Sequence, residues 1–262
     1  MLSYLRLSVV LAACSLAACS TISTSANGGG HAAFGADAKE NYELGMKELD
    51  GKNFLEAQRF FEFVSAKFPY SSYSALADLA SADLEYQQEK YVEAIDKYRT
   101  FIKLHPTHPK DGYASFQVAM SYYEQIPSDY FFLPNSAEKD QTDALNSLNA
   151  FNEFLIQYPT NDLHPKAQEK VADLRHRLAD HEMRIAKFYS QHERPRAAAG
   201  RYETVLREYS GAGFDGDAAI LLYGVYVKLD EKDKGKAALE KLVKEHPDDP
   251  MVPKAKQLLG QG

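Results

Sequence analysis

The residue types that carry catalysis or bind metals occur in this sequence without the spacing that either task requires. The eight histidines are spread along the chain, and none forms the i, i+4 pair that sets two zinc ligands on one helix face. They are His31, His105, His108, His164, His176, His181, His192 and His246. No serine or cysteine lies in a nucleophile motif of the G-x-S-x-G type. We therefore expect no catalytic site, no metal and no cofactor.

Phosphate and nucleic-acid binding lack their usual residues as well. Gly28–Gly30 has no following lysine and no preceding strand, so it is not a phosphate-binding loop. The adjacent carboxylates Asp248 and Asp249 lie in a predicted turn and are most simply solvated. The chain has 37 acidic and 30 basic residues and a net charge of −7, whereas nucleic acid selects a basic surface. We expect no nucleic-acid partner.

Both cysteines, Cys14 and Cys19, lie in the first twenty residues, so the folded body has neither a disulfide nor a thiol ligand. Arg6 is the only charged residue before Asp37, and residues 7–18 are apolar or small, which is typical of a targeting segment. No other stretch approaches the ~18 apolar residues that span a bilayer. Residues 1–18 are therefore predicted to be a signal peptide.

This segment resembles a bacterial lipoprotein signal, in which a leucine and two small residues precede the cysteine that receives lipid. The motif occurs twice, at 11–14 and 16–19. Cys14 would leave an apolar core of only seven residues, which is at the lower limit, so Cys19 is favoured as the lipidation site. The alternatives are lipidation of Cys14 or an ordinary secretory signal. Residues 19–36 are rich in Ser, Thr, Ala and Gly and are predicted to be a flexible tether.

The rest of the chain is organised by one repeated helical pattern. Between Tyr91 and Pro109, apolar residues recur at i, i+3, i+4, i+7, i+10 and i+11, which is one face of an α-helix that Pro106 ends. The main positions are Tyr91, Ala94, Tyr98, Phe101 and Pro106, and the other copies are Phe54, Ala57, Phe61, Val64, Pro69; Ala144, Ser147, Phe151, Phe154, Pro159; Pro195, Ala198, Tyr202, Val205, Ser210; and Lys232, Gly235, Leu239, Leu242, Pro247. Five copies predict a repeat protein.

The helices of these repeats can be placed from the same periodicity. We expect helices at 37–50, 53–67, 72–88, 90–104, 111–125, 141–157, 165–191, 196–209, 217–228 and 232–245, with one last turn at 254–259 and no strand. Residues 126–139 carry two prolines and form an insertion, whose aromatic run Tyr130-Phe131-Phe132 either tucks into a groove of the repeats or awaits a partner. The long helix at 165–191 is expected to join an N-terminal half, 37–160 with repeats 1–3, to a C-terminal half, 161–262 with repeats 4–5.

A helix pair of ~34 residues resembles the tetratricopeptide repeat. Repeat one has Leu44, Gly45, Ala57, Phe61 and Pro69 at the signature positions of that family. The small residues let the two helices of a pair approach closely, and the aromatic residue fills the gap to the next pair. The resemblance implies an all-α fold, a right-handed solenoid of about five such helix pairs.

The whole arrangement is similar to the BamD family of lipoproteins, which belongs to the β-barrel assembly machinery of the Gram-negative outer membrane. The more specific marks are Phe68-Pro69-Tyr70 with Tyr73, Phe101-Ile102, Pro106-Thr107-His108-Pro109, Phe131-Phe132, Leu178–Tyr189, and Arg201 with Leu206–Tyr209. Ser210 departs from the family, which usually has proline there, and the final repeat matches poorly.

The resemblance implies a non-enzymatic scaffold, lipid-anchored on the periplasmic face of the outer membrane. Its partners would be the POTRA domains of the barrel-forming subunit, the C-terminal signals of unfolded outer-membrane proteins, and other assembly lipoproteins. Two alternatives remain: another tetratricopeptide envelope lipoprotein, such as a secretin pilotin or an envelope-coordination factor, and an enzyme-associated domain. A different membrane partner would distinguish the first, and activity on cell-wall substrates the second.

The resemblance also implies two binding surfaces. Tetratricopeptide repeats line a concave face with positions 2, 5, 9 and 12 of each first helix. The expected peptide groove is therefore Tyr42, Met46, Leu79, Tyr86, Tyr113, Phe116, Met120 and Tyr123, unless the insertion or tight curvature covers it. Arg201 matches an arginine that the family uses to contact the barrel subunit. The alternative is a solvated arginine paired near Glu208 or with Glu203.

Overall fold

The computed structural model describes residues 33–127 and 140–260. The chain divides into two units, and the second, Phe34–Gly262, contains all the described helices and no described strand. The helices are α1 (Ala38–Asp50), α2 (Phe54–Lys67), α3 (Ser72–Gln87), α4 (Tyr91–Leu104), α5 (Asp111–Glu124), α6 (Thr142–Gln157), α7 (His164–Gln191), α8 (Pro195–Glu208), α9 (Asp215–Lys228), α10 (Lys232–Glu245) and α11 (Val252–Gly260). The predicted helices are confirmed, each end shifted by at most two residues.

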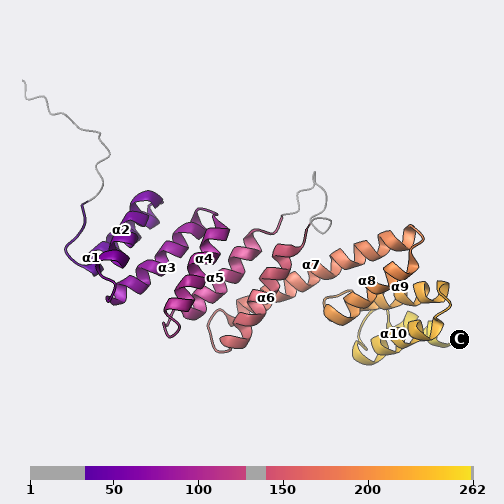
Figure 1. Cartoon of the computed structure of the whole chain (residues 1–262). Helices are drawn as coiled ribbons and strands as arrows, with labels where there is room; N and C mark the ends of the chain where they lie inside the picture. Colours follow the sequence, from indigo (N-terminus) through magenta and orange to yellow (C-terminus); the bar gives the residue numbers. More distant parts are fainter. Residues whose placement is uncertain (1–32, 128–139, 261–262) are drawn as a thin grey trace, which may run out of the picture. The chain divides into compact units, whose positions relative to one another are not determined.

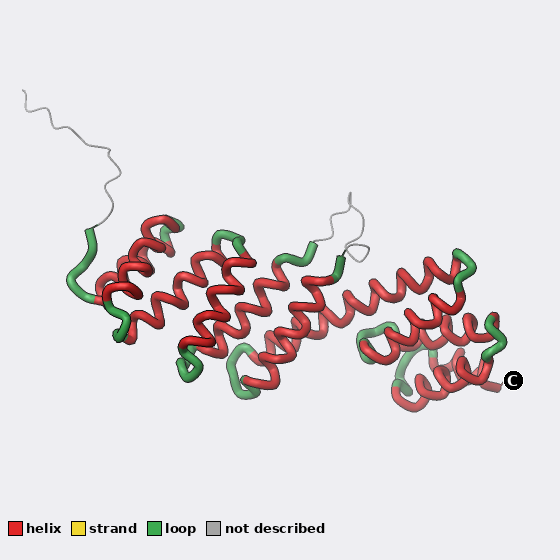
Figure 2. Tube along the Cα trace, viewed as in Figure 1, coloured by secondary structure: helices red, strands yellow, loops and turns green. Residues whose placement is uncertain are grey.

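Helices that follow one another in the sequence pack against one another, and the only other principal contacts in the described region are α1 with α3 and α9 with α11 (Figure 1). Short turns connect most of the helices, as the alternation of helix and loop in Figure 2 shows. Contacts restricted to neighbouring elements are the mark of a repeat protein, in which each unit completes the core of the next. The predicted all-helical repeat fold is confirmed. None of the described helices combines the length and the apolar composition needed to cross a bilayer.

The core lies where the repeat pattern places it. The aromatic or leucine position of each repeat is at most 1% exposed, and these residues are Phe61, Tyr98, Phe151, Tyr202 and Leu239. Small residues fill the facing positions for a steric reason. A Cβ on Gly45 would lie 2.6 Å from the Phe61 ring, and a Cβ on Gly235 would lie 3.0 Å from the Cα of Tyr223. Gly235, which stands where most other repeats have alanine, therefore preserves the close approach of two helices.

One turn geometry recurs between the two helices of four repeats. Lys52, Glu89, Glu193 and Asp230 have φ between 55° and 61°, in the left-handed region. In each turn the amide of the next residue donates a hydrogen bond to a carbonyl five residues earlier, as from Asn53 to Glu48 at 2.8 Å. This is the Schellman motif that ends helices. In the first of these turns Gly51 follows the end of α1 with a right-handed φ of −75°, and Lys52 takes the left-handed position.

Helix α7 runs for 28 residues and contributes to two core clusters. Its N-terminal part places Ala167, Leu174 and Leu178 in the cluster with Phe151 and Phe154. Its C-terminal part places Ala179, Met183 and Ala186 in the cluster with Tyr202. The two clusters meet at the consecutive residues Leu178 and Ala179, so one continuous helix joins the two groups of repeats, as the sequence predicts.

The chain enters the folded unit at Phe34. The Phe34 ring stacks on Phe63 with centroids 3.8 Å apart, and the Arg59 guanidinium lies 4.4 Å from the Phe34 centroid. The buried Asn41 side chain accepts a hydrogen bond from the Gly35 amide at 2.9 Å and donates one to the Gly35 carbonyl at 3.1 Å. The last residues of the predicted tether are therefore packed. The predictions for Cys14 and Cys19, and for the aromatic run 130–132, lie outside the described residues.

Candidate binding surfaces

The first surface is the predicted groove on α1, α3 and α5, which we call the first-helix face. Of its eight predicted residues, five are partly buried: Tyr42, Met46, Tyr86, Tyr113 and Tyr123. The other three lie in the core, with Leu79 at 5%, Phe116 at 3% and Met120 at 8% exposed. The repeat positions that predict the groove do not distinguish the buried residues from the partly buried ones. The exposure of each side chain depends on how closely the next helix covers it.

Phe116 shows why these three residues are covered. Its ring lies 5.5 Å from Phe151 and 5.6 Å from Phe154, both on α6 and both in edge-on contact. Leu79 packs in the cluster that includes Ala94 and Tyr98 of α4. These side chains hold neighbouring repeats together. The accessible part of the first-helix face is accordingly made mainly of tyrosine.

The tyrosines of this face contact other polar or aromatic groups. Tyr42 lies 5.6 Å from Tyr73 between ring centroids, and Tyr86 lies 5.4 Å from Tyr91 in edge-on geometry. Burial, together with the nearby Glu124 carboxylate, raises the pKa of Tyr86 to about 12. A neutral hydroxyl on a ring that is held in place presents both an apolar face and a hydrogen-bonding group.

Asp83 lies on α3 at position 9 of the second repeat, between Leu79 and Tyr86 of the first-helix face. Its Oδ1 accepts hydrogen bonds from the hydroxyls of Tyr98 at 2.6 Å and Tyr113 at 2.9 Å. Burial raises the pKa of the Asp83 carboxyl above its ordinary value, although these two hydrogen bonds and the Lys110 charge act in the opposite direction. The same burial and the Asp83 charge raise the pKa of Tyr98 and of Tyr113. This part of the face is thus a hydrogen-bond acceptor held by two tyrosines.

Helix α7 contributes to the same face at its far end. The Tyr123 hydroxyl donates to Asp173 Oδ2 at 2.8 Å, and Lys170 Nζ lies 3.8 Å from the centroid of the Tyr123 ring. Burial and the hydrogen bond to Asp173 raise the pKa of Tyr123 to about 12. Lys170 and Asp173 were not predicted as site residues. They lie about 50 residues from Tyr123 in sequence, and no local pattern indicates the contact.

The second surface is the neighbourhood of Arg201 on α8. Arg201 Nη1 donates to both carboxylate oxygens of Glu182 on α7, at 3.1 and 3.0 Å. The Arg201 side chain is 44% exposed, whereas that of Glu182 is 13% exposed. Neither expected acidic partner binds it, because Glu203 accepts a hydrogen bond from Tyr226 and Glu208 accepts one from Arg207 at 2.9 Å. Glu182 therefore orients an arginine that a partner could still reach.

The described residues contain no group of three or more His, Cys, Asp and Glu side chains arranged to hold a metal ion. Both surfaces are suited to binding polypeptide. The first offers aromatic area with fixed hydrogen-bonding groups, and the second offers an oriented guanidinium.

Comparison with known proteins identifies a family. A family model described as "YfiO: Outer membrane lipoprotein" matches residues 35–242. The outer membrane protein assembly factor BamD of Caulobacter vibrioides is 28% identical over 195 residues, which cover 74% of this chain and 61% of that protein. BamD of Xylella fastidiosa (strain 9a5c) is 28% identical over 231 residues, covering 82% of this chain and 78% of that protein. A tetratricopeptide repeat protein of known structure from Parabacteroides merdae matches at 17% identity with a TM-score of 0.39, covering 86% of this chain and 74% of that chain.

Proposed function

We propose a function for this chain from one premise: it belongs to the YfiO family of outer membrane lipoproteins. The resemblance to BamD is thereby confirmed at the level of the family. The similar proteins are named outer membrane protein assembly factors, and we infer the same role here. Since the match spans 61% of the Caulobacter protein's length, its activity and partners come to this chain as proposals. The chain would act as a non-catalytic scaffold that brings unfolded barrel proteins and the barrel-forming subunit together.

The observation that supports this role best is the row of partly exposed tyrosines on the first-helix face. An extended peptide with an aromatic end can bury its ring against Tyr86 and Tyr123 and hydrogen-bond to fixed hydroxyls. Met46 adds an adaptable side chain, which suits a surface that takes many sequences. We assign the C-terminal signals of unfolded outer-membrane proteins to this face.

The C-terminal repeats would hold the POTRA domains of the barrel-forming subunit through Arg201. An arginine already oriented by Glu182 loses less conformational freedom when a partner carboxylate binds it. The lipid anchor is assigned to Cys19, which would place the scaffold on the periplasmic face of the outer membrane. Cys19→Ala should lose radioactive lipid label and leave the membrane fraction. Retention of label in Cys19→Ala, with loss in Cys14→Ala, would move the anchor to Cys14.

The peptide assignment is tested with the double variant Tyr86→Ala/Tyr123→Ala. A fluorescent peptide corresponding to the C-terminus of a bacterial outer-membrane barrel is titrated with the full chain in detergent, and anisotropy is recorded. Loss of the two rings against which the aromatic end of the peptide would pack should weaken binding at least ~10-fold, or about 1.4 kcal/mol. Phe116 is left unchanged in this test because it lies in the core, and truncating a buried phenylalanine costs about 3–5 kcal/mol of stability.

Tyr70→Ala is the matched control, because Tyr70 is a fully exposed tyrosine in the turn between α2 and α3 and lies off the first-helix face. It should bind the peptide as the wild type does. Equal affinity of the wild type and the double variant would remove the first-helix face from this role. Copurification with a secretion pore in place of the barrel-forming subunit would instead favour a pilotin-like function.

A further inference from the structure

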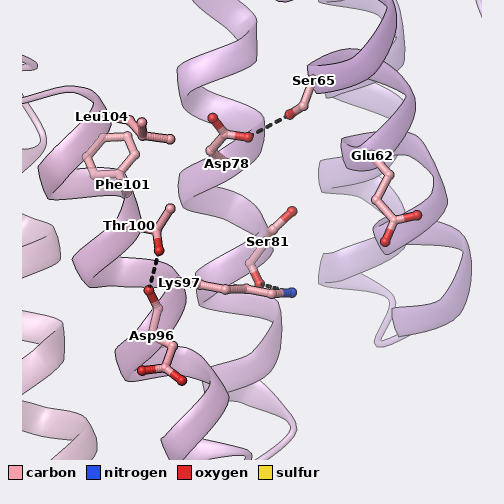
Figure 3. A pocket seen from close by; sticks show the side chains of 9 residues that line it. All are labelled: Glu62, Ser65, Asp78, Ser81, Asp96, Lys97, Thr100, Phe101 and Leu104. Atoms are coloured by element: carbon pink, nitrogen blue, oxygen red, sulfur yellow. Dashed lines mark hydrogen bonds between the residues drawn. The ribbon is translucent and has the colours of Figure 1, made fainter.

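A hollow of about 350 Å³ opens between α2 and α4, with α3 as its floor (Figure 3). Figure 3 shows Glu62 on one side, Asp96 and Lys97 on the other, and Asp78 between them. Phe101 contributes an apolar wall, and Leu104, which is 61% exposed, lies at the rim. The second helices α2 and α4 form this hollow, so it is separate from the first-helix face.

The charged side chains of this hollow leave an excess of negative charge. Three carboxylates and one ammonium group line it. Lys97 Nζ is held by Glu85 Oε1 at 2.6 Å, which neutralises the single cation. Asp78 accepts a hydrogen bond from Ser65 at 2.7 Å and lies 3.2 Å from His105 Nε2, so it is already engaged.

The two carboxylates that remain available are on opposite walls. Glu62 and Asp96 are both exposed residues, and Glu62 accepts a hydrogen bond from the uncharged Gln58 amide at 2.6 Å. An apolar wall beneath separated carboxylates matches the shape of an arginine or lysine side chain. Its methylene stem packs on hydrocarbon while its charged end binds oxygen atoms.

The equivalent hollow in the C-terminal repeats shows that this charge is not imposed by the fold. It lies between α8 and α10 over α9 and has a volume of about 500 Å³. Three basic residues, Arg207, Lys234 and Lys241, and one acidic residue, Glu203, line it. By the repeat alignment, Lys241 stands where the acidic hollow has Thr100, and Ala237 stands where it has Asp96. The same architectural position therefore carries opposite charge in the two halves.

We propose that the hollow between α2 and α4 is a docking site for an extended segment of a partner protein that places an arginine or lysine beside an aliphatic residue. The cation lies between Glu62 and Asp96, and the aliphatic residue packs on Leu104. This site is additional to the two proposed surfaces and binds the opposite charge from that expected at Arg201.

The probe is the fluorescein-labelled hexapeptide GSLRSG, compared with GSLESG, titrated by anisotropy with the full chain in detergent. GSLRSG should bind measurably better than GSLESG. The double variant Glu62→Gln/Asp96→Asn should weaken the binding of GSLRSG at least ~10-fold, or about 1.4 kcal/mol, because it removes both carboxylates that would bind the cation. Both side chains are exposed, so circular dichroism should show unchanged helix content.

Asp233→Asn/Glu240→Gln on α10 is the matched control, since it removes the same two charges from exposed positions outside the hollow. It should bind GSLRSG as the wild type does. Three results overturn the proposal: equal affinity for the two peptides, equal affinity of the wild type and the Glu62/Asp96 variant, or an equal loss in the control. The last result would mean that net charge alone attracts the peptide.

Discussion

The structure shows an ion pair between Arg201 and Glu182 that could not be predicted from sequence periodicity. The residue lies on the flank of α8, and its acidic partner Glu182 comes from the preceding helix, 19 residues earlier. Because this ion pair is partly exposed, its contribution to stability is small, typically ~0–1 kcal/mol. Its main effect is to fix the direction of the guanidinium.

Arg201→Glu is expected to lower affinity for the POTRA region at least ~30-fold, or about 2 kcal/mol, because it replaces the contacting cation with a like charge beside Glu182. Surface plasmon resonance with the POTRA fragment measures the change. Glu182→Gln is the control, since it keeps the Arg201 charge and removes only its orienting partner. Its loss should be clearly smaller. A loss below threefold for Arg201→Glu in a folded protein would return this residue to the solvated surface.

Asp83 predicts a pH dependence of stability. Its pKa is raised in the folded state, so the folded protein binds its proton more tightly than the unfolded chain does. Stability from this group therefore falls as pH rises from its ordinary value of 3.8 through the raised pKa, and stays low above that window. Asp83→Asn keeps an oxygen for Tyr98 and Tyr113 and removes the ionisation.

The stability of Asp83→Asn relative to the wild type should accordingly be higher at pH 7 than at pH 4. Urea unfolding followed by circular dichroism at the two pH values gives this difference. Asp217→Asn, at an exposed position of α9, removes the same charge and serves as the control. An unchanged difference at the two pH values would show that the Asp83 site does not favour the protonated form.

The candidate site residues were only partly predictable. Repeat spacing places both Tyr86 and Phe116 on the first-helix face, at different positions of their repeats, yet Tyr86 is partly exposed and Phe116 lies in the core. The difference comes from α6, whose Phe151 and Phe154 cover Phe116. Position within a repeat is readable from sequence, whereas coverage by the next repeat depends on side-chain sizes that meet only after folding.

At the scale of elements, the helices follow from the period of the apolar residues, and their starts follow from local chemistry. Asp37 caps the first helix, and its side chain accepts a hydrogen bond from the Glu40 amide at 2.9 Å. The Schellman turns were not expected, because glycine is the usual signal and four other residues stand there. Tertiary packing of each pair holds these residues in a conformation that their side chains disfavour.

Glu193→Gly should therefore stabilise the protein by about 0.5–1 kcal/mol, since a left-handed residue with a side chain costs about 1–2 kcal/mol and glycine loses part of this gain in chain entropy. Thermal unfolding measures the shift. Lys187→Gly, at an exposed position inside helix α7, which ends just before this turn, should instead destabilise the protein by about 1 kcal/mol. The same sign for both variants would contradict the strain at Glu193.

For the whole molecule, α7 is the helix that couples the stability of two core clusters. We expect the groups of repeats on either side to unfold together because Leu178 and Ala179 are consecutive residues of one helix but belong to different cores. The predicted boundary at 160 falls just before α7, whose N-terminal part packs with Phe151 and Phe154 of the preceding repeat.

In the variant His181→Pro, the two groups of repeats should unfold in separate transitions. Proline in a helix interior removes a hydrogen bond and costs about 3 kcal/mol or more. Since the sequence has no tryptophan, urea unfolding is followed by tyrosine fluorescence and circular dichroism. We expect coincident curves for the wild type and for the control His181→Ala, and two resolved steps for His181→Pro. Coincident curves in the proline variant would mean that the cores are coupled by contacts other than the continuity of α7.

Because α7 is continuous, evolution should conserve the number of residues in this helix more strictly than the types of residue on its exposed side. Each residue added to an α-helix advances it by 1.5 Å and turns it by about 100°. A single insertion near Glu169 would rotate everything C-terminal to it, including Arg201, away from its present bearing, whereas most substitutions at that exposed position would leave the bearing unchanged. Homologues of this protein should therefore show substitutions along the exposed side of α7 far more often than insertions or deletions within it.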